Sequence, residues 1–375
     1  MSSPVTLETL LRRFTAPSAP DLLRDLPDGR IQCLACGHRC RIAEGHPGVC
    51  RVRFVEGGRL LRPRGYVGAL ACDPIEKKPF FHAFPGRDAL TFGMLGCDLR
   101  CGYCQNWVTS QVLRDDDAVA PPRPASAADL VDAAIDLGTP VLASSYNEPL
   151  ITADWAVEVF TLARERGLTC GFISNGNGTP EVLRYLRPHV DLYKVDLKGF
   201  SDRAYRDLGG KLSNVLQTIE ELKKLGFWVE IVTLLVPGFN DSKEEVEGAA
   251  RFIAGVDPDI PWHITAFHPD YKMNDRGRTP VETILQAYEI GREAGLRFVY
   301  PGNVPGQVGD REDTSCPGCG ELLIRRRGFL VLENRMRGSA CPGCGARVPG
   351  VWEPEPPRGT PGSGRPRPVA LRGEL

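Results

Sequence analysis

Between residues 89 and 306, short apolar segments of strand type alternate with amphipathic segments of helical period. The predicted strands are ALTFGML, PVLASSY, LTCGFIS, DLYKVDL, FWVEIVTLLV, WHITAF and RFVYPG. The predicted helices are ASAADLVDAAIDLG, ITADWAVEVFTLARERG, SNVLQTIEELKKLG, SKEEVEGAARFIAG and PVETILQAYEIGREAG. Such alternation folds as βα units with right-handed crossovers around a parallel sheet. Six or seven units in this length favour an α/β fold of partial TIM-like (β/α)6 type over an open sheet.

The loop after the first predicted strand carries Cys97, Cys101 and Cys104 in the segment GMLGCDLRCGYCQNW. Three thiolates at this spacing fit on one tight loop and can bind three corners of a cubane iron–sulfur cluster. A fully ligated [4Fe–4S] cluster takes four thiolates, so one iron would stay open to a small molecule. An open metal position is typical of catalytic sites. The alternative is a zinc knuckle that shares a ligand with another loop.

The composition is that of an ordinary globular protein, with 375 residues, 42% hydrophobic and 25% charged. A formal net charge of -1 gives no sign of a polyanion-binding surface, so we expect no nucleic-acid partner. No apolar run approaches the roughly 18–20 residues needed to cross a membrane. The opening segment MSSPVTLETLLRRF lacks the features of a secretory signal. We therefore expect a cytoplasmic protein without membrane contact.

Eleven of the 13 cysteines fall into three groups, which in a reducing compartment read as metal ligands rather than disulfides. The first group offers four thiolates and hence a closed site, structural or electron-relaying. We expect zinc at this site. An auxiliary [4Fe–4S] cluster is the alternative, because the spacing of the cysteines suits both. His38 and His46 are possible replacements for one thiolate. The members of this group are Cys33, Cys36, Cys40 and Cys50.

Two CPGCG knuckles near the C-terminus are typical of a zinc ribbon, with iron in a rubredoxin-like site as the alternative. The intervening ELLIRRRGFLVLENRMRG reads as a hairpin-like spacer. The module would stabilise the protein or dock a partner. Its ligands are Cys316, Cys319, Cys341 and Cys344. Of the two remaining cysteines, Cys170 is predicted to lie in a buried strand, and Cys72 is ambiguous.

These features predict four parts of the chain. An N-terminal region with a four-cysteine metal site spans residues 1–88, and the barrel spans 89–306. A zinc-ribbon module follows over 307–352. The Pro/Gly/Arg-rich tail, 353–375, has little to bury and is predicted to be disordered.

An ordered series of motifs resembles the radical S-adenosylmethionine (SAM) enzyme of the AmmeMemoRadiSam system, a relative of the pyruvate formate-lyase activating enzymes. The resemblance covers roughly residues 31–335. It rests on DPIEKKPFFHAFPG (73–86), CDLRCGYCQNW (97–107), YNEP (146–149), SNG (174–176), VDLKGFSDRAYR (195–206), VEIVTLLVPGFNDS (229–242), PWHITAFHPDYKM (261–273) and VYPGNVPG (299–306).

The resemblance implies a radical SAM barrel with a [4Fe–4S] cluster whose open iron is chelated by SAM. One electron from the reduced cluster, itself supplied by a reducing electron donor, then cleaves SAM to a 5′-deoxyadenosyl radical, which takes hydrogen from a substrate. The resemblance does not identify the substrate. Activation of a protein partner by a glycyl radical is one class, and modification of a small molecule, nucleobase or peptide side chain is another. A hypothesis of a different kind makes the chain a metal-binding scaffold that docks partners through its zinc ribbon.

The resemblance also implies SAM contacts, while no catalytic residue beyond the cluster is assigned. Glu148 and Pro149 keep part of the family's glycine-glycine-glutamate motif near the SAM ammonium, and the alternative for Glu148 is a helix cap. Asp196 and Lys198, which alternation places on one side of their strand end, resemble a ribose- and carboxylate-binding pair; a surface ion pair is the alternative. The complete set of expected contacts is Glu148, Ser174, Asn175, Asp196, Lys198 and His268.

Overall fold

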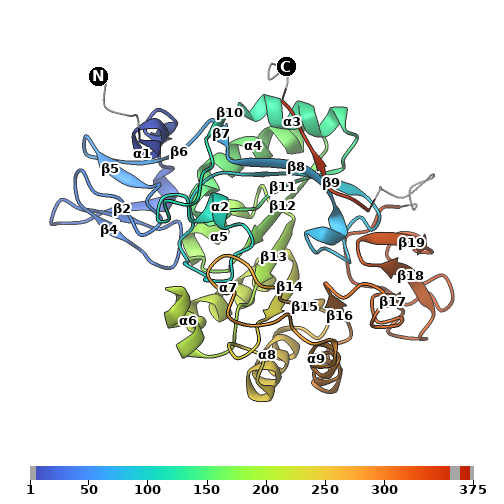
Figure 1. The fold of residues 1–375 in the computed structure, drawn as a ribbon. Coiled ribbons are helices and arrows are strands. Elements are labelled where there is room, and N and C mark those ends of the chain that lie inside the picture. The colour runs from blue at the N-terminus through green and yellow to red at the C-terminus, as the bar shows by residue number, and fades with distance from the viewer. Residues whose placement is uncertain (1–5, 355–363, 372–375) are drawn as a thin grey trace.

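The computed structural model of the chain describes residues 6–354 and 364–371. Its centre is a nine-stranded sheet with the strand order β16-β15-β14-β13-β12-β11-β9-β8-β20 (Figure 1). All neighbours from β9 to β16 are parallel. The parallel strands are β9 (Asp88–Gly93), β11 (Val141–Ser144), β12 (Thr169–Ser174), β13 (Leu192–Asp196), β14 (Trp228–Leu235), β15 (Trp262–Ala266) and β16 (Val299–Gly302). Because β16 and β20 do not pair with each other in the described residues, the barrel is partial, as the sequence predicts.

Helices connect the parallel strands, and the five helices predicted from periodicity are all present. These are α3 (Ala127–Asp136), α4 (Ala153–Glu165), α7 (Leu212–Lys224), α8 (Lys243–Val256) and α9 (Val281–Glu293). Two short helices, α5 (Pro180–Leu186) and α6 (Asp202–Leu208), were not predicted. Their signals are local, since Thr179 and Ser201 cap their first turns with side-chain oxygens.

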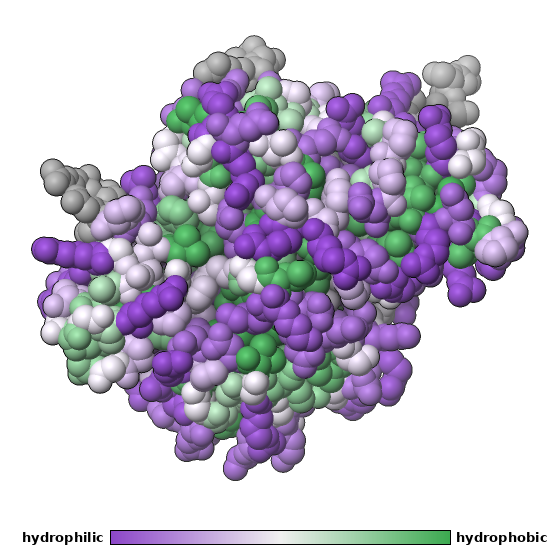
Figure 2. Space-filling view, turned by 180° about the vertical axis from the view of Figure 1, so that it is seen from behind, coloured by the Kyte–Doolittle hydropathy of each residue, from purple (hydrophilic) through white to green (hydrophobic). Residues whose placement is uncertain are grey.

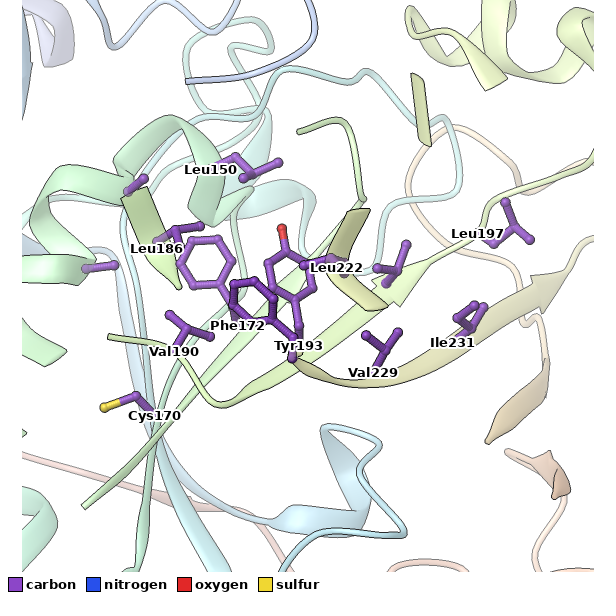
Figure 3. Packing of buried hydrophobic residues seen from close by; sticks show 14 of the residues in the cluster. Leu150, Cys170, Phe172, Leu186, Val190, Tyr193, Leu197, Leu222, Val229 and Ile231 are labelled. Carbon is purple, nitrogen blue, oxygen red and sulfur yellow. The ribbon is translucent and has the colours of Figure 1, made fainter. Parts of the chain in front are cut away.

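The core lies between the sheet and these helices. Phe172 and Tyr193, on neighbouring strands, have ring centroids 5.4 Å apart, and Leu186 and Val190 lie beside them (Figure 3). Cys170 is fully buried in β12, which confirms the prediction for it.

The sheet extends beyond the barrel through β8 (Ala69–Pro74) and β20 (Arg367–Pro368), both antiparallel to their neighbours. The prediction of a disordered tail is wrong for residues 364–371, because Arg367 pairs with Cys72 in the sheet and forms an ion pair with Asp88 at 2.7 Å. Leu371 is 5% exposed and packs into the core. The rest of the predicted tail from residue 355 onward lies outside the described residues.

The N-terminal region and the C-terminal module lie on opposite sides of the barrel (Figure 1). The N-terminal region holds two small antiparallel sheets, β1-β6-β5 and β2-β3-β4, and the C-terminal module holds β17-β18-β19. The predicted hairpin between the two knuckles is the β18–β19 pair. The bounds are β1 (Thr15–Pro17), β2 (Leu23–Asp25), β3 (Ile31–Cys33), β4 (Arg41–Ile42), β5 (Phe54–Glu56), β6 (Arg59–Pro63), β17 (Thr314–Ser315), β18 (Leu322–Arg327) and β19 (Leu330–Asn334).

The remaining elements are short: α1 (Leu7–Leu11), α2 (Trp107–Ser110), β7 (Tyr66–Val67), β10 (Arg123–Pro124) and the 3-10 turns η1 (Pro20–Leu22), η2 (Ile75–Lys77) and η3 (Pro149–Thr152). Seen from behind, polar side chains cover much of the surface and apolar ones form separate patches (Figure 2). Within the described part of the chain, none of the helices has the length and apolar character that a membrane span requires.

Candidate active site and metal centres

A cavity of about 870 Å³ lies where the parallel strands end. The loops that follow successive strands all contribute to its wall, because the carboxyl ends of parallel strands meet at one edge of the sheet. These contributions include Cys97 after β9, Asn147 after β11, Asn175 after β12, Lys198 after β13, His268 after β15 and Asn303 after β16.

Cys97, Cys101 and Cys104 line this cavity, and among the described residues of its wall they are the only cysteines. Their loop is fastened at Arg100, whose backbone N–H donates to the carbonyl of Leu208 at 2.9 Å. Burial raises the pKa of the Cys101 thiol to about 12, so an added metal must displace its proton. Three thiols that reach one open space fit a [4Fe–4S] cluster with one free iron.

Glu148 lies in the same wall and is 3% exposed. Its carboxylate accepts hydrogen bonds from the Ser174 hydroxyl at 2.7 Å and the Asn175 backbone N–H at 2.7 Å. It also accepts from the Leu150 N–H at 3.1 Å and so caps η3, while its contact with SAM stays a prediction. Burial, and then the charge of Asp98, raise the pKa of Glu148 to about 8. A cation placed in the cavity would offset that cost and favour the ionised carboxylate.

Ser174 and Asn175 differ in position. Ser174 is absent from the described cavity wall and acts behind it, donating to Glu148 and accepting from the Gly176 N–H at 3.0 Å. Asn175 reaches the wall, and its amide donates to Asp98 at 2.7 Å.

Asp196 and Lys198 both line the cavity, 3.4 Å apart, so their ion pair belongs to the cavity rather than to the outer surface. The ammonium of Lys194 lies closer to the Asp196 carboxylate than that of Lys198 does. Lys194 is 5% exposed. We did not predict Lys194, although the alternation that joins Asp196 to Lys198 also extends back to residue 194. His268 lies at the exposed rim, where its Nδ1 is 3.2 Å from the amide nitrogen of Gln105.

Comparison with known proteins decides the family. The sequence model of the Radical SAM superfamily matches residues 92–253. The uncharacterized protein MJ0808 of Methanocaldococcus jannaschii is 37% identical over 328 residues, which cover 86% of this chain and 96% of that protein. The chain belongs to the Radical SAM superfamily. It is a radical SAM enzyme of the activating-enzyme type, and the family implies a [4Fe–4S] cluster and SAM.

Two further relatives of the radical SAM enzyme carry functional names. The pyruvate formate-lyase-activating enzyme of Clostridium pasteurianum is 25% identical, with 51% of this chain and 84% of that protein covered. The 7-carboxy-7-deazaguanine synthase of Thermococcus kodakarensis is 28% identical, with 46% and 73% covered.

Another wall of the radical SAM cavity holds a polar network that we did not predict. The Tyr146 hydroxyl donates to Asp73 at 2.5 Å, and the ammonium of Lys78 bonds to Asp73 and, at 3.2 Å, to Tyr146. Burial lowers the pKa of Lys78 to about 8. Asp73 and Lys78 belong to DPIEKKPFFHAFPG, which carried the family resemblance without a stated role.

The C-terminal cysteines form a separate group whose geometry could hold a metal ion. Their four sulfurs lie within 4.8 Å of one another, with Cys316 and Cys344 3.6 Å apart and Cys319 and Cys341 3.7 Å apart. Tetrahedral zinc with bonds of about 2.3 Å separates its sulfurs by about 3.8 Å. The group is therefore consistent with the predicted zinc site.

The N-terminal cysteines lie outside the described cavity wall. Cys33, Cys36 and Cys50 are buried and Cys40 is partly buried. The His38 ring bonds to the Asp98 carbonyl through Nε2, and the His46 ring bonds to the Glu44 carbonyl through Nδ1. The metal of this group stays a prediction.

Proposed function

We propose that this radical SAM enzyme cleaves SAM reductively and removes a hydrogen atom from a protein partner in the cytoplasm, as a member of the AmmeMemoRadiSam group. The observation that carries the proposal is the shared cavity. The three-thiol loop, Glu148 and the Asp196–Lys198 pair all face it, and it opens to solvent at His268.

Cys97, Cys101 and Cys104 would hold the cluster in this cavity. When bound, the cluster and SAM supply one-electron bond cleavage and a carbon radical that can take hydrogen. The remaining chemistry belongs to binding and orientation. Glu148 offers a buried negative charge to the SAM ammonium, and Ser174 and the Asn175 N–H fix its direction.

The Lys194–Asp196–Lys198 group offers charges of both signs at the next strand end. The lysines suit a carboxylate and Asp196 suits ribose hydroxyls. His268, at the rim, has an aromatic face suited to a purine. Lys194 is buried, and Asp196 and Lys198 are partly buried, which strengthens their electrostatic contacts with a ligand.

The rim supports a protein substrate. Its side chains include exposed residues from three separate loops, so the cavity is not sealed. These are Gln105, Asn106, His268, Arg278, Arg327 and Phe329. An open rim of this kind admits a protruding loop, and the activating enzyme among the relatives is named for action on a protein.

The proposal is tested with anaerobically prepared, iron-loaded protein, dithionite and SAM. We expect 5′-deoxyadenosine, measured by chromatography. Fully iron-loaded protein that forms none would contradict the proposal.

A small-molecule substrate is the second candidate, favoured by the relative named for synthesis of a deazaguanine. An anaerobic extract of the source cells, split by ultrafiltration, separates the two. Acceleration of 5′-deoxyadenosine formation by the retained fraction, lost after protease treatment, supports a protein partner. Acceleration by the filtrate supports a small molecule instead.

A further inference from the structure

The four N-terminal cysteines lie directly behind the loop that carries Cys97. The ring Nε2–H of His38, between Cys36 and Cys40, donates to the carbonyl of Asp98 at 3.0 Å. The Gly37 N–H donates to the carbonyl of Asn177 at 2.8 Å.

Asp98 joins the two cysteine groups from the other side. It is 2% exposed, and its carboxylate accepts from the amides of Asn175 and Asn177, both at 2.7 Å. Its charge acts on Cys36, and it is the neighbour of Cys97 in the chain. Hydrogen bonds to Asp98 therefore connect His38, which lies between Cys36 and Cys40, with Asn175 in the cavity wall.

The close docking at this junction depends on a glycine. A Cβ at Gly37 would lie 2.2 Å from the Asn214 amide nitrogen and 2.4 Å from the Asn177 amide oxygen. No side chain fits there without displacement, so this packing brings the N-terminal site close to the cavity.

A buried arginine points to an anionic centre at the N-terminal site. Arg53 is 1% exposed and forms an ion pair with Asp154 at 2.6 Å through Nη2. Its Nε and Nη1 have no hydrogen-bond partner among the described residues, and its charge interacts with Cys33, Cys50 and Cys36. Unpartnered buried N–H groups are costly, and sulfur ligands of a metal centre would satisfy them.

The spacing of the thiols separates the possible metals. Among the described residues, the C-terminal group is the only one with three or more ligand atoms within 4.8 Å of one another. Neither the N-terminal group nor the cavity trio meets this limit, whereas a tetrahedral zinc ion holds its sulfurs about 3.8 Å apart. A cubane accepts a wider spread, because each thiolate binds a different iron.

The N-terminal site also has an outward side. Cys40 is partly buried, and its sulfur accepts the N–H of Val49 at 3.4 Å. Val49 is 47% exposed. An electron carrier can therefore approach at Cys40, while Cys36 lies toward Asp98.

We propose that Cys33, Cys36, Cys40 and Cys50 bind an auxiliary [4Fe–4S] cluster that relays electrons to the cluster held by Cys97, Cys101 and Cys104. A reduced flavodoxin- or ferredoxin-type protein gives one electron to the auxiliary cluster. That cluster is reoxidised when the same electron passes on, and no bond or proton is exchanged. The proposed electron relay depends on the proposed SAM cleavage. The metal content proposed for the N-terminal site does not depend on it.

Metal analysis of the anaerobically prepared full chain tests the site. We expect about 8 Fe and 1 Zn per chain. The variant C97A/C101A/C104A should keep about 4 Fe with a [4Fe–4S] spectrum, and C36A/C50A should also keep about 4 Fe. About 4 Fe with 2 Zn in the unaltered protein, or no iron in the variant of the trio, would overturn the proposal. These readouts do not depend on SAM cleavage.

The relay is tested with His38→Ala, which keeps all cysteines. The ratio of 5′-deoxyadenosine formed with a reduced flavodoxin-type protein to that formed with dithionite should fall several-fold, at unchanged iron content. The matched control is His46→Ala, since His46 lies in the same module but is exposed, and among the described residues its ring bonds only to the Glu44 carbonyl. An unchanged ratio in His38→Ala, or an equal fall in both variants, would overturn the relay.

Discussion

The C-terminal cysteines and the cavity cysteines use the same ligand atom in opposite settings. In the C-terminal module, two knuckles bring four sulfurs within 4.8 Å of one another, which leaves no position for another ligand on a tetrahedral ion. At the barrel, three thiols reach a cavity of about 870 Å³ beside a buried carboxylate. The number of thiols and the space around them therefore predict a structural metal in the module and a catalytic one in the cavity.

The largest expected effect comes from removing the cavity thiols. C97A/C101A/C104A should reduce 5′-deoxyadenosine formation to background, because no ligand remains for the cluster that binds SAM. The control is Cys170→Ala, a fully buried cysteine in β12 that lies outside the described cavity wall. It should cost about 1 kcal/mol of stability and keep SAM cleavage. SAM cleavage that persists in the triple variant would contradict the assignment of a catalytic cluster to these three thiols.

The second effect concerns the closed site. C316S/C319S should lose about 1 Zn and lower the melting temperature by about 5 °C, since metal binding contributes to folding. It should keep most of its 5′-deoxyadenosine formation, because these residues do not line the described cavity. Complete loss of cleavage in a protein that still folds would show that the two sites are coupled.

The third effect is a pH dependence that belongs to the cavity alone. Since burial raises the pKa of Glu148 to about 8, the folded SAM-free protein keeps a proton that the unfolded chain releases above its ordinary pKa near 4.5. The free energy of unfolding should therefore fall as pH rises from about 4.5 to 8, by at most about 1.4 kcal/mol per pH unit. Glu148→Gln should flatten this slope in denaturant unfolding, and SAM should flatten it in the unaltered protein. If the free energy of unfolding of Glu148→Gln falls equally steeply with pH, the pH dependence comes from another group.

Much of the fold could be predicted because its signals are local. The predicted strand FWVEIVTLLV became β14, Trp228–Leu235, and the helix SNVLQTIEELKKLG became α7, Leu212–Lys224. The cysteine groups were found by spacing within short segments. Lys194 was missed although the alternation of its strand contains it.

The sequence by itself determined the repeat of strands and helices, the three cysteine groups and the loop that ends β9, because periodicity and ligand spacing act over a few residues. Only the tertiary structure decided that β20 pairs with β8, that Arg53 is buried near three cysteines, and that Asp98 joins His38 to Asn175. The β8–β20 pairing and the contacts of Asp98 join segments dozens to hundreds of residues apart, and packing selects them from many partners of similar chemistry.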